Sequence, residues 1–348
     1  MVDEKIRAFV LHKVNDLRMD WVEMPILKPD QALVKIKSVG ICGSDIHYYR
    51  NGRIGPFILR KPMILGHECA GEVMEVGSEV TNVRAGDRVV IEPGVPCRKC
   101  WYCRNGRYNK CAKVTFMATP PDDGCLVEYI AHPSDYLFKM PDSMSFQEGA
   151  LAEPLSVGLQ AVRRSGLYPA ASVAILGAGP IGLVTLEMVK AVGAGSVIIV
   201  DVIASRLALA KKMGVTHAIN AREENVVEKI RELTSGEGVH FVFETAGVPS
   251  TVRQTVEVAR EGGTAVLIGL APGLEIPMPM IDLIAKEINL VSVFRYCNVF
   301  EEAVTLMAHN RINVKPIMTH QFPFDRTIEA FEVAEKEKDK AVKVVVNV

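Results

Sequence analysis

The sequence has no excess of charge of either sign. Its 348 residues include 40 Lys and Arg against 41 Asp and Glu, which leaves a formal net charge of −1. No global field favours nucleic acid or an anionic membrane surface, so we expect neither as a partner. With 49% hydrophobic and 23% charged residues, the composition is that of a globular protein that can bury a sizeable core, which excludes disorder as the main state.

Long uninterrupted apolar runs are also missing. The opening MVDEKIRAFV has no apolar run of signal-peptide length, so we expect no export segment and a cytoplasmic protein. The longest stretch without a charge, Ser165 to Leu186, is broken by four glycines and two prolines. We interpret it as a turn, a buried strand and the start of a helix rather than a membrane span. No low-complexity tract and no internal repeat beyond a strand and helix alternation is visible.

Cysteine, by contrast, is abundant and unevenly spread. Four of the eight cysteines fall within fifteen residues, at Cys97, Cys100, Cys103 and Cys111. This spacing indicates a closed tetrahedral zinc site with a structural role rather than a disulfide framework. Five basic residues and no acid lie among these cysteines, and they offset the charge of four thiolates: Arg98, Lys99, Arg104, Arg107 and Lys110. Cys69, Cys125 and Cys297 have no metal role that the sequence assigns.

The pattern of the chain changes near residue 150. Before it, short apolar runs end in Gly or Pro, which is typical of strands and turns. Ser145 and Glu148 form a capping-box signal that predicts a helix through LSVGLQAVRR, with Pro154 near its start. From Ser172, apolar runs at 173–176, 196–200, 217–220, 239–244, 264–269 and 288–294 alternate with helical patterns at 181–192, 204–213, 225–234 and 251–259. This alternation predicts an α/β fold with a doubly wound, six-stranded parallel sheet. Beyond it we expect a helix at 300–309, a charged helical stretch and a last strand in AVKVVVNV.

A dinucleotide fingerprint opens the first of these units. Gly177, Gly179 and Gly182 form GxGxxG between a predicted strand and a predicted helix that begins with Pro180 and Ile181, and Asp201 ends the next strand. The glycines suit a tight turn, the approach of a pyrophosphate and close helix packing. Asp201 would accept hydrogen bonds from the adenosine ribose and repel a 2′-phosphate, which predicts NAD over NADP. Arg206, five residues later, could favour NADP instead.

A second set of metal ligands falls in the N-terminal region. GICGSDIHYY contains Cys42, and GHE contains His67 and Glu68. Each residue alone is more often structural, but a nicotinamide enzyme needs a group that handles the hydroxyl proton while hydride leaves carbon. Zinc held by Cys, His and Glu keeps a coordination position open, where it can stabilise the alkoxide that forms when the proton leaves.

These motifs resemble zinc-dependent medium-chain dehydrogenases, and more narrowly their sorbitol or polyol dehydrogenase branch, which includes xylitol dehydrogenases. The matching motifs are GICGSDIHYY, PMILGHECAG, GDRVVIEPGVPCRKCWYC, FMATPPDDG, LAEPLSVG, GAGPIGL and VFRYCN. The resemblance implies a GroES-like, β-rich catalytic domain at 1–150, a Rossmann domain at 151–294, and a C-terminal return at 295–348. It also suggests a tetramer or a dimer.

The resemblance also implies roles for single residues. Cys42, His67 and Glu68 would bind the catalytic zinc, with Glu153 as a further ligand or as the holder of a water. Ser44 and His47 match a proton relay. The positions that match contacts to the polyol are Tyr48, Phe116, Thr119, Arg295 and Tyr296. Two zinc ions per chain and NAD are the expected cofactors.

The expected reaction is oxidation of a secondary alcohol, as in sorbitol to fructose or xylitol to xylulose. One alternative is a threonine or butanediol dehydrogenase with the same ligand pattern. Another class is a non-enzymatic zinc and NAD-binding protein, either regulatory or structural. The intact ligand set argues against that class. The sequence does not rank the polyols.

Overall fold

The computed structural model describes residues 5–270 and 275–348. The chain divides into two compact units. The first comprises Met1–Glu153, Cys297–Asn310 and Met318–Val348, and the second comprises Pro154–Tyr296 and Arg311–Ile317. The chain therefore leaves the first unit twice, at Pro154 and at Arg311, and returns to it each time. Arg311–Ile317, which the sequence assigned to the C-terminal return, is part of the second unit.

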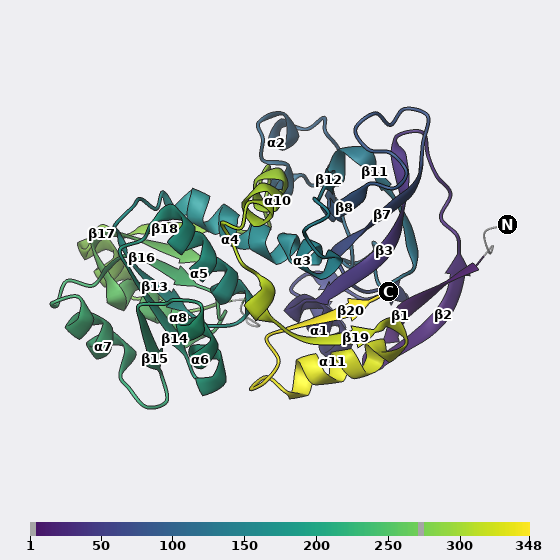
Figure 1. Cartoon of the computed structure of the whole chain (residues 1–348). Coiled ribbons are helices and arrows are strands. Elements are labelled where there is room, and N and C mark those ends of the chain that lie inside the picture. The colour runs from purple at the N-terminus through teal and green to yellow at the C-terminus, as the bar shows by residue number, and fades with distance from the viewer. Residues whose placement is uncertain (1–4, 271–274) are drawn as a thin grey trace. The chain divides into compact units, whose positions relative to one another are not determined.

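The first unit is built on a seven-stranded sheet in which β3 (Gln31–Ile41) is central (Figure 1). Antiparallel partners of β3 are β7 (Glu68–Val76), β11 (Tyr129–Pro133) and β20 (Lys343–Asn347). The outer strands are β8 (Arg88–Ile91), β12 (Leu137–Lys139) and β19 (Met318–Pro323). Because β3 is buried over most of its length, both of its faces contribute to the core of the unit.

Smaller strand groups complete this unit. A three-stranded sheet contains β1 (Lys5–Lys13), β2 (Asp16–Glu23) and β6 (Met63–Ile64). Two-stranded pairs are formed by β4 (Arg53–Ile54) with β5 (Phe57–Ile58), and by β9 (Gly94–Val95) with β10 (Thr115–Phe116). The core includes Phe9, Ile36, Leu126 and Phe331, each at most 2% exposed. The GroES-like, β-rich prediction agrees with this architecture.

Helices of the first unit are short and lie between the strands. They are α1 (Gly43–Asn51), α2 (Trp101–Arg104), α3 (Phe146–Ala150), α10 (Phe300–Ala308) and α11 (Thr327–Lys336). The predicted capping box is confirmed, since Ser145 Oγ accepts from the Glu148 N–H at 3.2 Å and the Ser145 N–H donates to Glu148 Oε2 at 3.0 Å. The single helix predicted from this cap is wrong. It ends at Ala150, and α4 (Ala152–Ser165) begins afterwards, because Pro154 has no N–H and fits a first helical turn rather than an interior.

The second unit confirms the predicted six-stranded parallel sheet. Its order is β15-β14-β13-β16-β17-β18, with every neighbouring pair parallel. The strands are β13 (Ser172–Leu176), β14 (Ser196–Asp201), β15 (His217–Asn220), β16 (Val239–Glu244), β17 (Ala259–Leu267) and β18 (Asn289–Ser292). The order reverses between β13 and β16, which is where doubly wound sheets bind ligands at the carboxyl ends of their strands.

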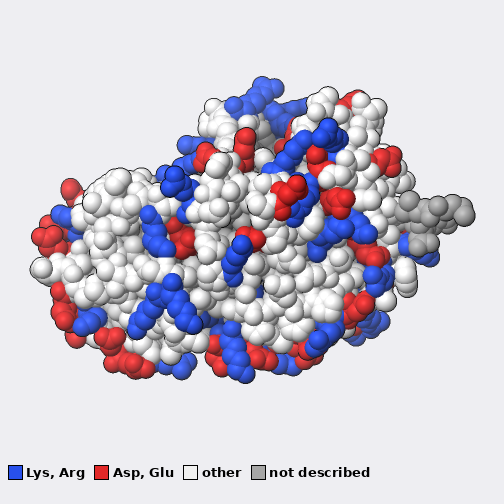
Figure 2. All heavy atoms as spheres, in the orientation of Figure 1, with Lys and Arg blue, Asp and Glu red and all other residues white. Residues whose placement is uncertain are grey.

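Helices connect these strands, and the spacing predicted four of them but not the one at Met280–Ala285. They are α5 (Pro180–Val192), α6 (Ala204–Lys212), α7 (Val226–Leu233), α8 (Pro249–Val258) and α9 (Met280–Ala285). The segment Ser165 to Leu186 runs from the end of α4 through β13 into α5. Within the parts of the chain that the structure describes, no helix has the length and apolarity needed to cross a bilayer. Figure 2 shows acidic and basic atoms interspersed over the visible face of each unit.

Candidate active site and zinc centres

Three predicted ligands from neighbouring segments meet in the first unit. Cys42 follows the last residue of β3, Glu68 is the first residue of β7, and His67 directly precedes it. The register of the two strands sets Glu68 opposite Gly40. One ligand atom from each of the three residues lies within 4.8 Å of the others. The antiparallel pairing of β3 and β7 therefore assembles the group.

The carboxylate of Asp45 orders two of these ligands. Its Oδ2 accepts the Cys42 N–H at 3.0 Å, and its Oδ1 accepts the Gly66 N–H at 3.1 Å. The same Oδ1 lies 3.6 Å from Nδ1 of His67. Metal-binding histidines usually face a carboxylate or carbonyl with the ring nitrogen that does not bind the metal. Asp45, which is buried, is placed to fix the orientation of the His67 ring.

Glu68 is held by a buried lysine from a distant strand. The Lys343 ammonium donates to Glu68 Oε1 at 2.6 Å, to Oε2 at 2.7 Å and to the Ile41 carbonyl at 3.1 Å. Strand β3 lies between the strands of the two charged residues. The Glu68 carboxylate passes Gly40, where an added Cβ would lie 2.1 Å from Oε2. A side chain at position 40 would therefore displace the Glu68 carboxylate from its place beside Lys343.

The charges of this group favour a cation. Burial lowers the pKa of His67, but the Asp45 carboxylate and the Cys42 thiol outweigh burial and hold the pKa well above its ordinary value. Nδ1 of His67 is buried and lies 3.6 Å from Asp45 Oδ1, too far for a hydrogen bond within the described residues, so the two groups interact by charge. A thiol, an imidazole and a carboxylate are ligand types of catalytic zinc sites. The residues thus fit a zinc ion in chemistry and in spacing.

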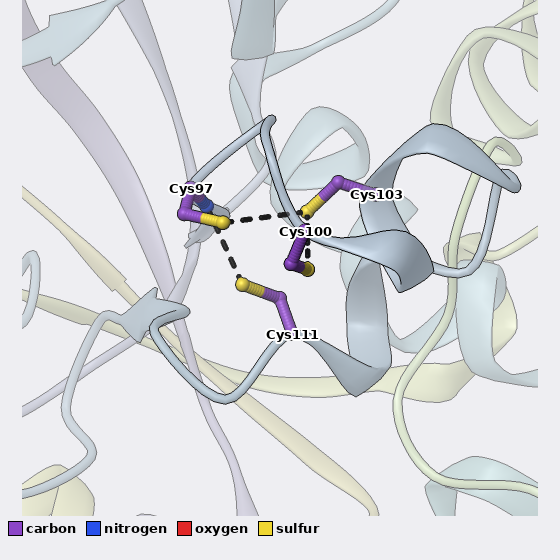
Figure 3. A group of neighbouring side chains, drawn as sticks. All are labelled: Cys97, Cys100, Cys103 and Cys111. Atoms are coloured by element: carbon purple, nitrogen blue, oxygen red, sulfur yellow. Dashed lines mark hydrogen bonds between the residues drawn. The ribbon is translucent and has the colours of Figure 1, made fainter.

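The four predicted structural ligands also converge (Figure 3). The sulfurs of Cys97, Cys100, Cys103 and Cys111 all lie within 4.8 Å of one another. The separation is 3.9 Å between Cys97 and Cys103 and 3.4 Å between Cys100 and Cys103. Zinc–sulfur bonds of about 2.3 Å in a tetrahedron require sulfurs about 3.8 Å apart. The cluster therefore has the size of a four-thiolate zinc site, and all four cysteines are free of disulfides.

The thiols of this cluster differ in acidity. Backbone N–H groups of Lys99 and Cys100 are the main causes that lower the pKa of Cys97 to about 6. Burial, followed by the neighbouring thiols, raises the pKa of Cys103 to about 12. Without a metal, the four thiols do not all ionise near neutral pH. Metal binding must therefore release protons, as it does at other thiolate zinc sites.

The glycine-rich turn of the second unit has the geometry that a phosphate cradle needs. Gly177 follows β13 with φ of +113°, and Gly179 caps α5 with Pro180 as its first residue. A Cβ on Gly182 would lie 1.9 Å from the Gly177 carbonyl oxygen. The turn can close only with glycine at that position. The free N–H groups at the start of α5 can then receive a pyrophosphate.

Asp201 ends β14 beside this turn. Its Oδ2 accepts the Ala178 N–H at 2.7 Å, and its Oδ1 accepts the Ile203 N–H at 2.9 Å. The carboxylate is therefore fixed at the edge of the turn, where a ribose would contact it. Arg206 lies close by, because a Cβ on Gly179 would be 3.8 Å from its guanidinium. Its Nε is buried without a hydrogen-bond partner among the described residues, which leaves it available to an anion.

Family comparisons agree with this geometry. Residues 28–142 match the model of the alcohol dehydrogenase GroES-like domain, and residues 180–309 match that of the zinc-binding dehydrogenase. Sorbitol dehydrogenase of Bacillus subtilis is 42% identical over 345 residues, which cover 99% of this chain and 98% of that protein. The chain belongs to the zinc-dependent medium-chain dehydrogenases. Within that family it belongs to the sorbitol dehydrogenase branch.

Solved structures of this dehydrogenase family share the whole fold. An Escherichia coli oxidoreductase of unknown specificity aligns with a TM-score of 0.95 at 38% identity, covering 99% of each chain. The 2R,3R-butanediol dehydrogenase of Bacillus subtilis aligns with a TM-score of 0.90 at 32% identity, also covering 99% of each chain. The fold is thus common to dehydrogenases whose alcohols differ, so substrate choice depends on local residues.

The remaining predicted catalytic residues of the dehydrogenase lie in two helices. Ser44 and His47 are on α1; Ser44 is half-buried, whereas His47 is exposed, with Nδ1 3.4 Å from the Asn51 amide. Glu153 is buried in the first turn of α4, outside the group of three converging ligands. Its contact with a metal or a water, and the relay through α1, stay predictions.

Predicted substrate residues fall in both units. Phe116 lies beside the ligand group, with its ring centroid 5.9 Å from that of His67. Thr119 is in the same loop, where its N–H donates to the Phe116 carbonyl at 3.0 Å. Tyr48 is buried on α1. Arg295, with φ of +55°, and buried Tyr296 belong to the second unit, so their contact with substrate stays a prediction.

Two residues of the ligand environment were missed by sequence reasoning. Asp45 follows Cys42 by three residues, a spacing at which its carboxylate reaches the Cys42 N–H and caps α1. That spacing was a usable signal. Lys343 is the single charge within AVKVVVNV, and a lysine inside a buried apolar strand requires a buried partner. The partner, Glu68, could not be identified from sequence spacing.

The three unassigned cysteines lie outside both ligand groups. Cys69, Cys125 and Cys297 are each at most 9% exposed. Burial is the main cause that raises the pKa of Cys125 well above its ordinary value, and the neighbouring Cys69 adds to it. Buried cysteines outside a metal site usually pack as small apolar side chains.

Proposed function

We propose that this chain is an NAD-linked, zinc-dependent polyol dehydrogenase that oxidises a secondary alcohol of sorbitol or xylitol to the ketose. The observation that carries the proposal is the convergence of Cys42, His67 and Glu68 in a chain that also has the dinucleotide turn. Identity of 42% with a sorbitol dehydrogenase supports the polyol as substrate.

Each residue near the candidate zinc site has a separate role in the proposed reaction. Cys42, His67 and Glu68 would hold the catalytic zinc, which supplies a Lewis acid to the reacting alcohol oxygen when bound. Asp45 keeps the His67 ring in one orientation, and Lys343 holds the Glu68 carboxylate in place. The buried Phe116 ring excludes water beside His67. Ser44 and His47 would carry the hydroxyl proton outward, because His47 is exposed.

The second unit would supply the hydride acceptor. Backbone N–H groups at the start of α5 would bind the pyrophosphate, and Asp201 would bind the ribose hydroxyls. A fixed carboxylate repels a 2′-phosphate, which favours NAD over NADP. Arg206 beside Gly179 would pair with a pyrophosphate oxygen, a role that reconciles this arginine with NAD. Asp201→Ala should therefore improve the use of NADP relative to NAD.

A substrate panel tests the reaction. NADH formation is followed by absorbance with sorbitol, xylitol, ribitol, threonine and butanediol, each with NAD and with NADP. We expect turnover of polyols with NAD, and we expect Cys42→Ala to abolish turnover while NAD binding remains. Two zinc ions per chain should be found by elemental analysis. If a protein loaded with two zinc ions per chain forms no NADH with any of these alcohols, the proposal is refuted.

A second candidate is a 2,3-butanediol or threonine dehydrogenase. It is favoured by the structural match to a butanediol dehydrogenase over 99% of both chains. The lower identity of 32%, against 42% for the sorbitol dehydrogenase, makes it the weaker candidate. A non-enzymatic zinc and NAD-binding protein is the remaining class. The same panel separates the three possibilities.

We also propose that the chain forms a dimer or a tetramer and acts in a reducing compartment such as the cytoplasm. All eight cysteines are free of disulfides. β18 is the outer strand of its sheet, and Leu290 on it is 46% exposed. Ile281 and Ile284 of α9, which precedes β18, are 79% and 63% exposed. An open strand edge near exposed apolar residues suits a second copy of the chain. Ile281→Glu should shift the sedimentation coefficient to that of a smaller assembly.

A further inference from the structure

The chain returns to the first unit at Cys297, directly after Arg295 and Tyr296. The next residue, Asn298, has a left-handed backbone with φ of +54°. Its N–H donates to the Tyr108 hydroxyl at 2.9 Å, and its side-chain amide donates to the Gly106 carbonyl at 2.9 Å. Asn298 itself is exposed, so these two hydrogen bonds hold a residue at the surface of the first unit. This part of the chain, residues 295–300, is called the return segment below. Asn298 ties it to the chain between Cys103 and Cys111.

The Tyr108 hydroxyl makes a second hydrogen bond in the opposite direction. It donates to Glu92 Oε1 at 2.7 Å while it accepts the Asn298 N–H. Glu92 is 2% exposed and directly follows the last residue of β8. The carbonyl of the next residue, Pro93, accepts the Met117 N–H at 3.2 Å, beside Phe116. One phenol therefore links the return segment to the strand end that supports the Phe116 loop.

The position of Tyr108 depends on the four-cysteine lobe, residues 97–111. Its regular structure is limited to four residues in α2 and three in the turn Tyr108–Lys110. Within the lobe, Cys111 is the single buried residue. A segment with so little core cannot fix its own conformation, and a structural zinc is the element that does so in such lobes.

We propose that Tyr108 is a positioning residue through which the four-cysteine lobe holds the return segment at Asn298, so that the lobe governs polyol binding as well as local stability. This proposal rests on the polyol dehydrogenase function, because Arg295 and Tyr296 are its predicted substrate contacts. Loss of the clamp leaves Val299 and Phe300 buried in the first unit. Tyr296 and Cys297 are buried as well, so loss of the clamp should loosen the chain at Asn298 and shift Arg295 and Tyr296 rather than release them.

The test compares Tyr108→Phe with Tyr102→Phe. The first variant keeps the ring that packs edge-on against Tyr136 at 6.4 Å and removes the bridging hydroxyl. The second removes a hydroxyl from the same lobe at a tyrosine that is 44% exposed. We expect Tyr108→Phe to raise KM for the polyol by about fivefold to tenfold, with little change in kcat or in KM for NAD. Tyr102→Phe should leave all three constants unchanged.

Hydrogen exchange gives a readout that does not need turnover. Peptides spanning residues 295–300 should exchange faster in Tyr108→Phe than in the parent or in Tyr102→Phe, with two zinc ions retained in each. Unchanged exchange in Tyr108→Phe would overturn the clamp, whatever the substrate. Faster exchange without any polyol turnover in the parent would instead refute the proposed function and leave the clamp standing.

A second variant guards against an unstable Tyr108→Phe protein. Asn298→Gly keeps the left-handed backbone accessible and removes the bond to the Gly106 carbonyl. It should raise KM for the polyol in the same direction. Because both variants act on one clamp, the effect of the double variant should be smaller than the product of the two single effects. If the increase in KM of the double variant equals the product of the two single increases, the residues act independently and the proposal is overturned.

Discussion

Glu92 is a buried carboxyl whose ionisation should reduce the stability of the protein. Burial is the largest cause that raises its pKa from 4.5 to about 8; the Tyr108 hydrogen bond lowers it and the charge of Glu153 raises it further. In the unfolded chain the carboxyl returns to its ordinary pKa. Between the two values the folded state holds a proton that the unfolded state has released. The free energy of unfolding therefore falls as pH rises through this range.

The size of the effect follows from the difference between the two pKa values. One titrating group changes the free energy of unfolding by about 1.4 kcal/mol per pH unit inside the range. Between about pH 5.5 and about pH 7.5, Glu92 should therefore lower the free energy of unfolding of the parent by about 3 kcal/mol. Glu92→Gln keeps a side-chain oxygen that accepts the Tyr108 hydroxyl and removes the titration. The free energy of unfolding of Glu92→Gln, relative to that of the parent, should therefore increase by this amount as the pH rises.

Urea unfolding at several pH values measures this difference. All other titrating groups are shared, so subtracting the two curves isolates Glu92. A matched control is Glu75→Gln, which neutralises an exposed glutamate in β7 of the same sheet. Its difference from the parent should not vary with pH beyond about 0.5 kcal/mol, the usual range of surface substitutions. A flat difference for Glu92→Gln would refute the reasoning, because it would mean that this carboxyl ionises as freely in the folded state as in water.

Three further changes test the ligand environment and the cofactor turn. Lys343→Met should lower the free energy of unfolding of the metal-free protein by about 3 to 5 kcal/mol, because it leaves Glu68 buried without its partner; adding Glu68→Gln should recover part of the loss in urea unfolding. Gly182→Ala should abolish NADH binding in a fluorescence titration while both zinc ions remain, because the new Cβ would lie 1.9 Å from the Gly177 oxygen. Cys97→Ser should reduce the zinc content from two to one per chain and lower Tm; an unchanged zinc count would contradict the four-thiolate site.

The second unit was predictable because its signals are local. The inner strands of a parallel sheet are buried on both faces and appear as continuous apolar runs, as in VAIL at 173–176. Several of its strand bounds were wrong, most of all in β17 and β18. β17 begins at Ala259 rather than 264, where its pairing with β16 is irregular, and β18 ends at Ser292 rather than 294. Strand ends depend on pairing with a neighbour, which a single segment does not reveal.

The first unit was less predictable because its contacts are non-local. Helix α1 was not predicted, since Asp45, Tyr48 and Tyr49 are its only buried residues and they form no apolar stripe. Ligand types and spacing indicated Cys42, His67 and Glu68, but not the residues that orient them. Tyr108 and Asn298 are likewise joined only by the fold. Sequence spacing identifies ligands that are close along the chain and misses partners that the sheet brings from elsewhere.

The pairing of Glu68 with Lys343 spans 275 residues of chain. During synthesis the carboxylate therefore leaves the ribosome long before its ammonium partner exists. Folding of the intervening sheet cannot bury Glu68 at low cost until β20 has been added beside β3. The order of translation thus delays closure of the metal site. A nascent chain that lacks β20 should remain open at this position and accessible to chaperones, however well its second unit has already folded.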